Sequence, residues 1–480
     1  MANDVSTPSP VQSAMVAEAK PVRTLVKGTK AMREAGEEYL PREPAETPAA
    51  YTARKTRSVL FNATGKTVVD MTGKVFDKPV VTDKVTDPDL AKWFTNIDNA
   101  GRDINVFARD VFFDAIQPGI GFIFVDMPPP VQRADGQPAT LADEQRAGIR
   151  PYLKYIPLEN LIGWKSTTLE GAEVLTQIRI SECATEADPE NPYQDKEIPQ
   201  IRVVNRVDGS APCTWQTFRE QDADGKRQVV QHQSGTITQP EIQIFPVYIS
   251  RDDFMKASPP LAKLAELNIA HWQSASDQRN ILHVARVPIL FGAGFTENDT
   301  LVVGASEMVQ SSNPQAKLEY VEHTGAAISA GDKDLQNLEL QMQAMGLQLL
   351  IDKPGQTATG EVRDDAKENS PLAMMAKALE VALTQAVQSM ARFAMKSEPK
   401  AGDIVVNKDF GITGNTSDFQ FLTQAMLGSK LDVQTWIDEA KRRGILQGSV
   451  DPEVVSSRVQ AMAPDLGTNI PPGKGMDLAK

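Results

Sequence analysis

The chain alternates between long segments with the spacing of helices and one segment with the spacing of strands. In a helix buried on one side, apolar residues recur every three to four positions, whereas in a half-buried strand they alternate. The first pattern predicts helices at 27–38, 49–76, 88–117, 259–285, 327–351 and 370–396. Two of them follow a serine and a proline, Ser258-Pro259 and Ser370-Pro371, which is a typical helix start.

The strand pattern is concentrated in residues 150–250, where β-branched and aromatic residues alternate with polar ones between loops rich in Asp, Gly and Pro. A buried strand is predicted within 119–130, ended by three prolines. Shorter strands are predicted at 288–292, 301–303, 317–321 and 403–410. Long helices and one β-rich segment together predict an α+β fold. Residues 1–18 lack periodicity, and both they and the tail from 464 are expected to be disordered.

Length and charge narrow the classes of function. The 480 residues suffice for about two to four structural units, and no apolar run is long enough to span a membrane. The N-terminus lacks the pattern of a secretory signal, and Cys183 and Cys213 lack metal-ligand spacing, so a reducing cytoplasm is expected. The net charge of −13 argues against tight binding of nucleic acid.

The most suggestive polar residues lie in the helix predicted at 259–285. Its two histidines, His271 and His283, stand about 120° apart around the helix, and Asp277 stands about 240° from His271. Because the three side chains point in different directions, they cannot converge on a substrate or a metal ion. We therefore interpret this helix as a structural element.

Other catalytic patterns are incomplete. Gly292 and Gly294 are followed by Glu297 where a dinucleotide-binding loop needs a third glycine, and neither a P-loop nor a GxSxG motif occurs. The acidic stretches 222–224 and 364–368 are interpreted as solvated loops. The sequence thus predicts no catalytic residue, no metal site and no cofactor.

The segment 351–369, "IDKPGQTATGEVRDDAKEN", is unusual because it separates two long predicted helices. It can be an ordinary solvent-exposed connection. Alternatively, it is a mobile finger that contacts a polyanion lightly and without sequence preference. The residues that would make such contacts are Lys353, Gln356, Thr357, Thr359 and Arg363.

The order of these elements resembles that of tailed-bacteriophage portal proteins, the head–tail connectors, in a group known as a domain of unknown function with portal topology. The similarity extends over roughly 38–460 and depends on several stretches in the right order. Those stretches are "YLPREPAETPAAYTARKTRSVLFNATGKTV", "RPYLKYIPLENLIGW", "SPPLAKLAELNIAHWQSASDQRNILHVARVPILFGAG", "LELQMQAMGLQLL", "TATGEVRDDAKENSPLAMMAKALE" and "DEAKRRGIL".

The resemblance implies a non-enzymatic ring, usually of twelve copies, at one vertex of the capsid. It implies a conduit for packaging and ejection of double-stranded DNA, with the major capsid protein, the terminase large subunit and a head–tail adaptor as partners. The parts it implies are a tail at 1–37, a wing at 38–257, a first stem helix at 258–285, a clip at 286–326, a second stem helix at 327–352, a tunnel loop at 353–366, a long wing helix and strand at 367–416, a crown at 417–463 and a disordered tail at 464–480.

Two other classes of function stay open at this point. One is a capsid-assembly scaffold that forms no ring, although the β-rich segment is not typical of one. The other is a metal-dependent hydrolase that uses the Asp- and Glu-rich loops, although no polar residues are predicted to converge.

Overall fold

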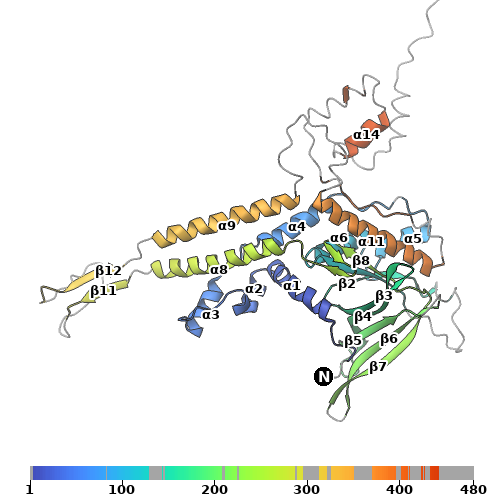
Figure 1. The fold of residues 1–480 in the computed structure, drawn as a ribbon, viewed down its shortest axis with the longest axis horizontal. Coiled ribbons are helices and arrows are strands. Elements are labelled where there is room, and N and C mark those ends of the chain that lie inside the picture. The colour runs from blue at the N-terminus through green and yellow to red at the C-terminus, as the bar shows by residue number, and fades with distance from the viewer. Residues whose placement is uncertain are drawn as a thin grey trace, which may run out of the picture. The chain divides into compact units, whose positions relative to one another are not determined.

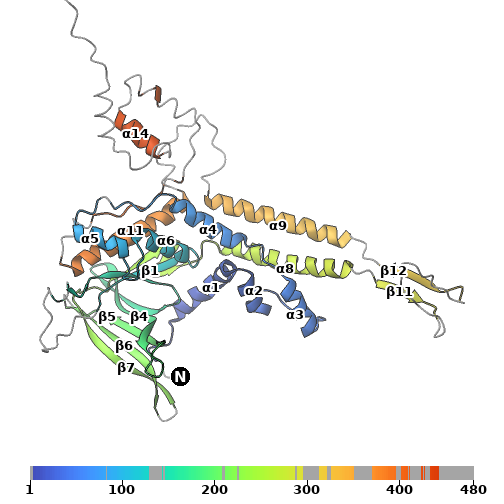
Figure 2. The ribbon, with the colours of Figure 1, turned by 180° about the vertical axis from the view of Figure 1, so that it is seen from behind.

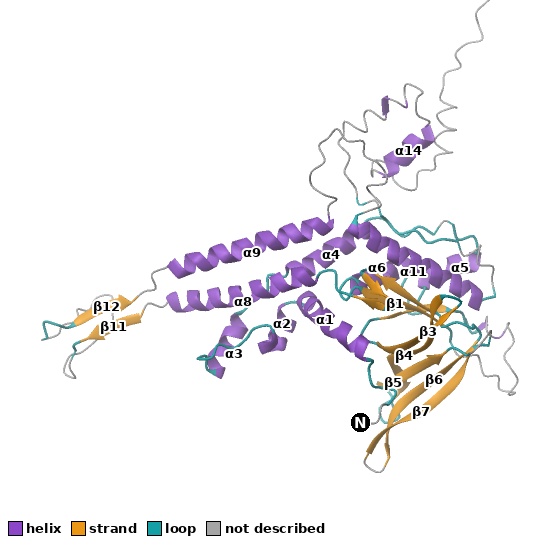
Figure 3. Cartoon of the chain, in the orientation of Figure 1, coloured by secondary structure: helices purple, strands orange, loops and turns teal. Residues whose placement is uncertain are grey.

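A computed structural model describes residues 4–82, 84–128, 143, 146–207, 211–223, 226–286, 289–295, 313–321, 326–350, 370–395, 402–408, 410, 423–424, 426 and 433–442. Helices and sheets are both abundant, so the α+β class is confirmed (Figures 1 and 3). The chain divides into two compact units, Met1–Lys408 and Asp409–Lys480. No helix in the described ranges is long and apolar enough to cross a membrane.

The first unit contains most of the described elements. Its helices are α1 (Pro10–Lys27), α2 (Thr29–Ala35), η1 (Gly36–Glu38), α3 (Pro48–Arg57), α4 (Ala63–Val75), α5 (Pro88–Trp93), η2 (Phe94–Asn96), α6 (Ile104–Ala115), α8 (Ala262–Ala285), α9 (Ala326–Leu350) and α11 (Pro371–Phe393). Its strands are β1 (Ile120–Asp126), β2 (Tyr152–Ile156), β3 (Leu161–Leu169), β4 (Ala172–Ala187), β5 (Asp195–Asn205), β6 (Cys213–Ala223), β7 (Lys226–Ile237), β8 (Ile244–Tyr248), β9 (Arg251–Asp253), β10 (Lys256–Ala257), β11 (Ile289–Ala293) and β12 (Lys317–Val321).

A three-stranded antiparallel sheet lies at the centre of this unit, in the order β2-β1-β8. The central strand β1 is buried along almost its whole length, and α6 and α11 pack against it. Gly119 immediately precedes this strand with a φ of +85°, and a Cβ there would clash with the carbonyl oxygen of Ser258. The close approach of Gly119 to Ser258 therefore holds the residues just before α8 against the start of β1. The strand predicted within 119–130 is confirmed as β1.

A five-stranded antiparallel sheet follows the chain order β3-β4-β5-β6-β7, which confirms the β-rich prediction for 150–250. One apolar cluster joins the two sheets to the N-terminal helix. It includes Phe122 and Phe124 of β1, Ile178 and Ile180 of β4, and Met15 of α1. The sheets and α1 therefore form one body, and the disorder expected for residues 1–18 is wrong from Pro10 onward. Ser9 caps α1 by accepting a hydrogen bond from the Gln12 amide, a local signal hidden by the Ser- and Pro-rich composition.

Two long helix predictions are each broken in the structure by polar caps. The segment 49–76 forms α3 and α4, and Asn62 starts α4 by accepting from the amide of Gly65. The segment 88–117 forms α5, η2 and α6, and Asp103 starts α6. A capping side chain supplies a partner for amides that a helix leaves unpaired, so it favours a new start over a continuous helix.

Two further predictions need correction. The helix predicted from 259 begins at Ala262, because the Ser258 hydroxyl donates to Asp252 and does not cap α8. The strand predicted at 403–410 is reduced to a single bridge, in which Val405 pairs with Val81. In the second unit the described helix is α14 (Val433–Arg442), where the Trp436 indole donates to the Thr423 hydroxyl at 3.1 Å. Most of the predicted crown and all of the tail from 464 lie outside the described residues.

Candidate functional site: the α8–α9 hairpin

Two long helices, α8 and α9, run side by side and project from the body of the first unit (Figures 1 and 2). Both were predicted from helical spacing, and both are confirmed within three residues at each end. They are antiparallel, because the earlier residue of α8 meets the later residue of α9: His271 meets Glu339, whereas Gln278, nearer the end of α8, meets Ile328 near the start of α9. Strands β11 and β12 follow at the far end of the pair.

The contact between α8 and α9 combines apolar packing with three polar pairs. His271 Nε2 lies 3.3 Å from Glu339 Oε1, and the Ser274 hydroxyl donates to Asp334 at 2.9 Å. The Gln278 amide donates to the carbonyl oxygen of Ile328 at 2.8 Å. These pairs fix the register of α8 relative to α9 along their axes.

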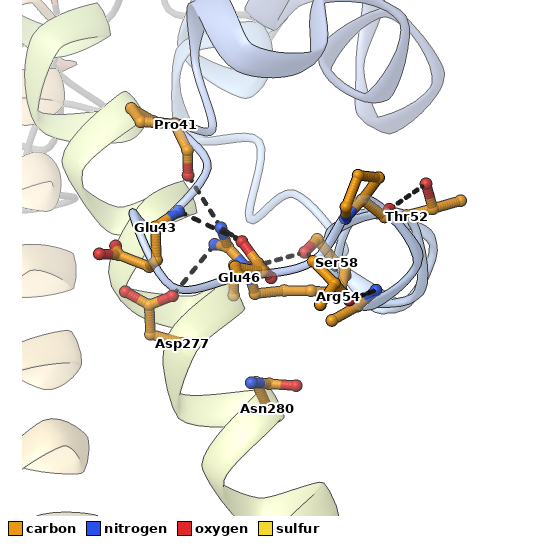
Figure 4. A network of polar contacts seen from close by, with 12 residues as sticks. Pro41, Glu43, Glu46, Thr52, Arg54, Ser58, Asp277 and Asn280 are labelled. Atoms are coloured by element: carbon orange, nitrogen blue, oxygen red, sulfur yellow. Dashed lines mark hydrogen bonds and ion pairs between the residues drawn. The ribbon is translucent and has the colours of Figure 1, made fainter.

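A buried guanidinium connects α8 to the body (Figure 4). Arg54 of α3 is 4 % exposed and donates to Glu46 through two nitrogens, at 2.9 and 2.8 Å. It also donates to the carbonyl oxygen of Pro41 at 2.8 Å and to Asp277 of α8 at 3.2 Å. We call these four groups the Arg54 network. Hydrogen bonds from Arg54 hold the pKa of Glu46 below its ordinary value, whereas burial raises the pKa of Asp277.

Further buried hydrogen bonds extend this connection toward the start of α8. The Ser58 hydroxyl lies 2.8 Å from that of Ser276. The Asn268 side chain accepts from the Thr64 amide at 3.0 Å and donates to the carbonyl oxygen of Phe61 at 2.7 Å. In the described structure α8 is therefore bound on one side to α3 and α4 and on another side to α9. It is a supporting helix, as its sequence predicted.

The three polar residues of α8 that resembled a catalytic set do not converge. His271 meets Glu339, Asp277 meets Arg54, and His283 is exposed. The prediction that they point in different directions is confirmed. Among the residues that the structure describes, no group of three His, Cys, Asp or Glu side chains could hold a metal ion.

At the far end of the hairpin, β11 and β12 pair with each other in antiparallel register, with Phe291 opposite Glu319 and Gly292 opposite Leu318. Phe291 and Leu318 are both exposed. The strand predicted at 301–303 lies outside the described residues. The two observed strands thus form a minimal two-stranded ribbon, an arrangement that is marginally stable by itself.

The five residues predicted to contact DNA, Lys353, Gln356, Thr357, Thr359 and Arg363, all lie outside the described residues. The structure does describe what precedes and follows their loop. Before it, α9 extends to Leu350. After it, Ser370 caps α11 by accepting from the Ala373 amide at 3.1 Å, as predicted.

The helix α11 is anchored on the central sheet, against β8 and β1. Its buried Glu380 accepts from Lys408 at 3.1 Å and from the Val406 amide at 3.1 Å, and it also pairs with Lys377. Sequence reasoning missed both Glu380 and Arg54. The nearby partners Lys377 and Glu46 look like ordinary surface charges in the sequence, and the partners that reveal burial, Lys408 and Asp277, lie 28 and 223 residues away.

Comparison with known proteins shows a likeness to one family and to solved structures. A family described as Domain of unknown function (DUF4055) matches residues 260–394. That range covers α8, β11, β12, α9 and α11. No curated protein matches the chain.

Among solved structures, a chain from the neck of an empty gene transfer agent (GTA) particle, computed with C6 symmetry, resembles this one. It is 12 % identical, with a TM-score of 0.37, and the match covers 80 % of this chain and 89 % of that chain.

Proposed function

We propose that the chain is the portal subunit of a tailed bacteriophage, which forms a ring at one capsid vertex. The observation that carries this proposal is the α8–α9 hairpin. Two long helices project from an α+β body, carry a β-ribbon at their far end, and continue through residues 351–369 into a third long helix on the central sheet. A subunit of this form can place its hairpin along the wall of a channel while its body packs against neighbours.

The proposal assigns a task to each part. The stem helices at 258–285 and 327–352 line the channel, and the clip at 286–326 docks the terminase large subunit and later the head–tail adaptor. The loop at 353–366 contacts the passing DNA. The body, as the wing, faces the major capsid protein.

The charge of the chain is compatible with a conduit. A ring of twelve copies has a formal charge of 12 × −13 = −156. Duplex DNA brings about one negative charge per 1.7 Å of its axis, so most of such a wall repels it. A repelling wall keeps the duplex centred, and a few cationic contacts then guide it without stopping its movement. Because the sequence has no P-loop, the energy for packaging comes from a separate motor.

Electron microscopy of the purified full-length chain tests the proposal. Closed rings with a central hole support it. Particles that remain monomeric across a range of salt concentrations contradict it and favour a scaffold that forms no ring. A metal-dependent phosphodiesterase activity that EDTA abolishes in monomeric protein would instead favour the hydrolase.

A further inference from the structure

One side of α8 carries cations that have no acidic partner. Arg279, His283 and Arg286 lie within about 60° of one another around the helix, and all three are exposed. We call them the basic stripe. Within the described ranges none of the three has an ion pair, and the Arg279 guanidinium donates to the carbonyl oxygen of Arg57. Trp272 and Ala275 lie on this same side of α8, before the stripe in the chain, and both are buried. The stripe is therefore the exposed continuation of a side that is buried nearer the start of the helix.

The opposite side of α8 carries carboxylates. Asp277 stands about 160° around the helix from Arg279, and its side chain is 55 % exposed. The carboxylates of Glu43 and Asp277 lie close together in Figure 4, and Glu43 adds to the forces that raise the pKa of Asp277. Asp334 of α9 bonds to Ser274, which is one turn before Asp277 on the same side of α8. We call Glu43, Asp277 and Asp334 the acidic side.

The acidic side is poorly neutralised within the chain. Arg54 bonds to Asp277, but it is buried and already shared with Glu46. Glu43 and Asp334 are exposed, and among the described residues neither side chain has an ion pair. The exposed Arg42 next to Glu43 acts on Glu46, whose pKa it helps to lower, and so offsets part of this charge, but the three carboxylates outnumber it. One flank of the hairpin is therefore positive and the opposite flank is net negative.

We propose that the basic stripe of one copy docks against the acidic side of the next copy, so that a head-to-tail contact through α8 and α9 closes the ring. This inference rests on the proposed ring and names the surfaces that form it. Two different patches on opposite flanks are what a heterologous interface requires, and repetition of that interface generates a ring when the rotation closes.

A neighbouring copy would neutralise the charges on both flanks, whereas DNA would neutralise only the basic stripe. Duplex DNA could neutralise the basic stripe, but it would leave the acidic side without a partner. A neighbouring copy neutralises both and brings its own carboxylates into contact with the arginines. The centres of the two patches are about seven residues, or about 10 Å, apart along α8. Copies in a closed ring are not translated along the ring axis, so this contact requires α8 to be inclined to that axis.

Two charge-reversal variants test the contact. The first, R279E/R286E, makes both flanks negative, and the second, E43R/D334R, makes both flanks positive. Asp277 is left unchanged because it belongs to the Arg54 network. Each variant should lose ring formation in size-exclusion chromatography with light scattering, while circular dichroism shows native secondary structure. E43R/D334R also loses the exposed Ser274–Asp334 hydrogen bond, so its unfolding midpoint is compared with that of S274A, which removes the same bond and should still form rings. An equimolar mixture should recover rings in which the two variants alternate.

The control variant K165E/K196E changes the net charge as much as R279E/R286E does, at two exposed positions of the five-stranded sheet. It should assemble like the native chain. If each reversed variant assembles by itself, or if folded variants fail to assemble when mixed, the contact is wrong although the ring proposal stands. Normal R279E/R286E rings that lose DNA would assign the stripe to DNA and also overturn the contact. A native chain that forms no ring contradicts the contact and the proposed function together.

Discussion

Removal of the Arg54 side chain should destabilise the first unit and loosen α8 from the body. In Arg54→Ala, the Glu46 carboxylate, which is 10 % exposed, loses its cation and two hydrogen bonds. Breaking a buried ion pair by removing one partner costs about 3–5 kcal/mol. Asp277 is half-exposed and can be rehydrated, so we expect a loss near the lower limit, about 3 kcal/mol in the free energy of unfolding.

The assay is urea unfolding followed by hydrogen exchange of the α8 amides, because exchange reports the local opening of one element. Arg57→Ala is the matched control: Arg57 lies on the same helix, is only half-buried and donates to the neutral Asn280. It should cost about 1 kcal/mol or less. Equal losses for the two variants would refute the interpretation of Arg54 as the strongest of the side-chain links between α3 and α8.

Acidification gives an independent check on the same network. Arg54 lowers the pKa of Glu46 in the folded state, so the stabilisation is present above the ordinary value of 4.5. It is lost as the pH falls through the lowered folded pKa. Arg54 also lowers the pKa of Asp277 and so partly opposes the effect of burial. The stabilisation that Arg54 gives through Asp277 is therefore also lost as the pH falls. The stability difference between the native chain and Arg54→Ala should therefore shrink as the pH falls from 7 to 3. A difference that is independent of pH would contradict this.

The remaining predictions concern the hairpin and its ends. Leu264→Asp should prevent ring assembly, because Leu264 is 2 % exposed and a buried unpaired carboxylate costs several kcal/mol, as thermal unfolding and chromatography would reveal. His271→Ala and His283→Ala should leave packaging intact, and loss of packaging in well-formed rings would show that these residues do more than support the fold. Deletion of 296–316 should abolish terminase binding and normal rings, since the short clip strands are expected to pair with those of neighbouring subunits; a deletion variant with normal rings that bind terminase in a pull-down contradicts this. Shortening of 355–361 should spare assembly but impair retention of a nearly full genome, measured as packaged DNA length and leakage; unchanged retention would mean that the loop is only a connection.

The sequence predicted the long elements well because long periodic patterns leave little choice. The runs at 327–351 and 370–396 correspond to α9 and α11 within three residues, and the β-rich segment corresponds to β2 through β8. Short elements were harder to predict because one capping residue decides them. Asn62 and Asp103 each start a helix inside a segment whose apolar spacing continued across the break.

The contacts that hold the candidate site could not be predicted from local sequence. Arg54 and Asp277 are 223 residues apart, and the opposite charges on the two flanks of α8 become visible only when Glu43, which precedes α3, and Asp334 of α9 are placed beside it. The sequence could exclude a convergent histidine site, because helical geometry alone separates His271 from His283. For the loop at 353–366, the DNA contacts stay a prediction.

Native mass spectrometry of the purified full-length chain tests the central claim most directly. A subunit of 52.4 kDa that closes into a ring of twelve gives one dominant species of 12 × 52.4, or about 629 kDa, which does not grow as the protein concentration rises. That result would support the proposed portal ring. A 52.4 kDa monomer at every concentration, or an open series of masses that lengthens with concentration, would contradict it.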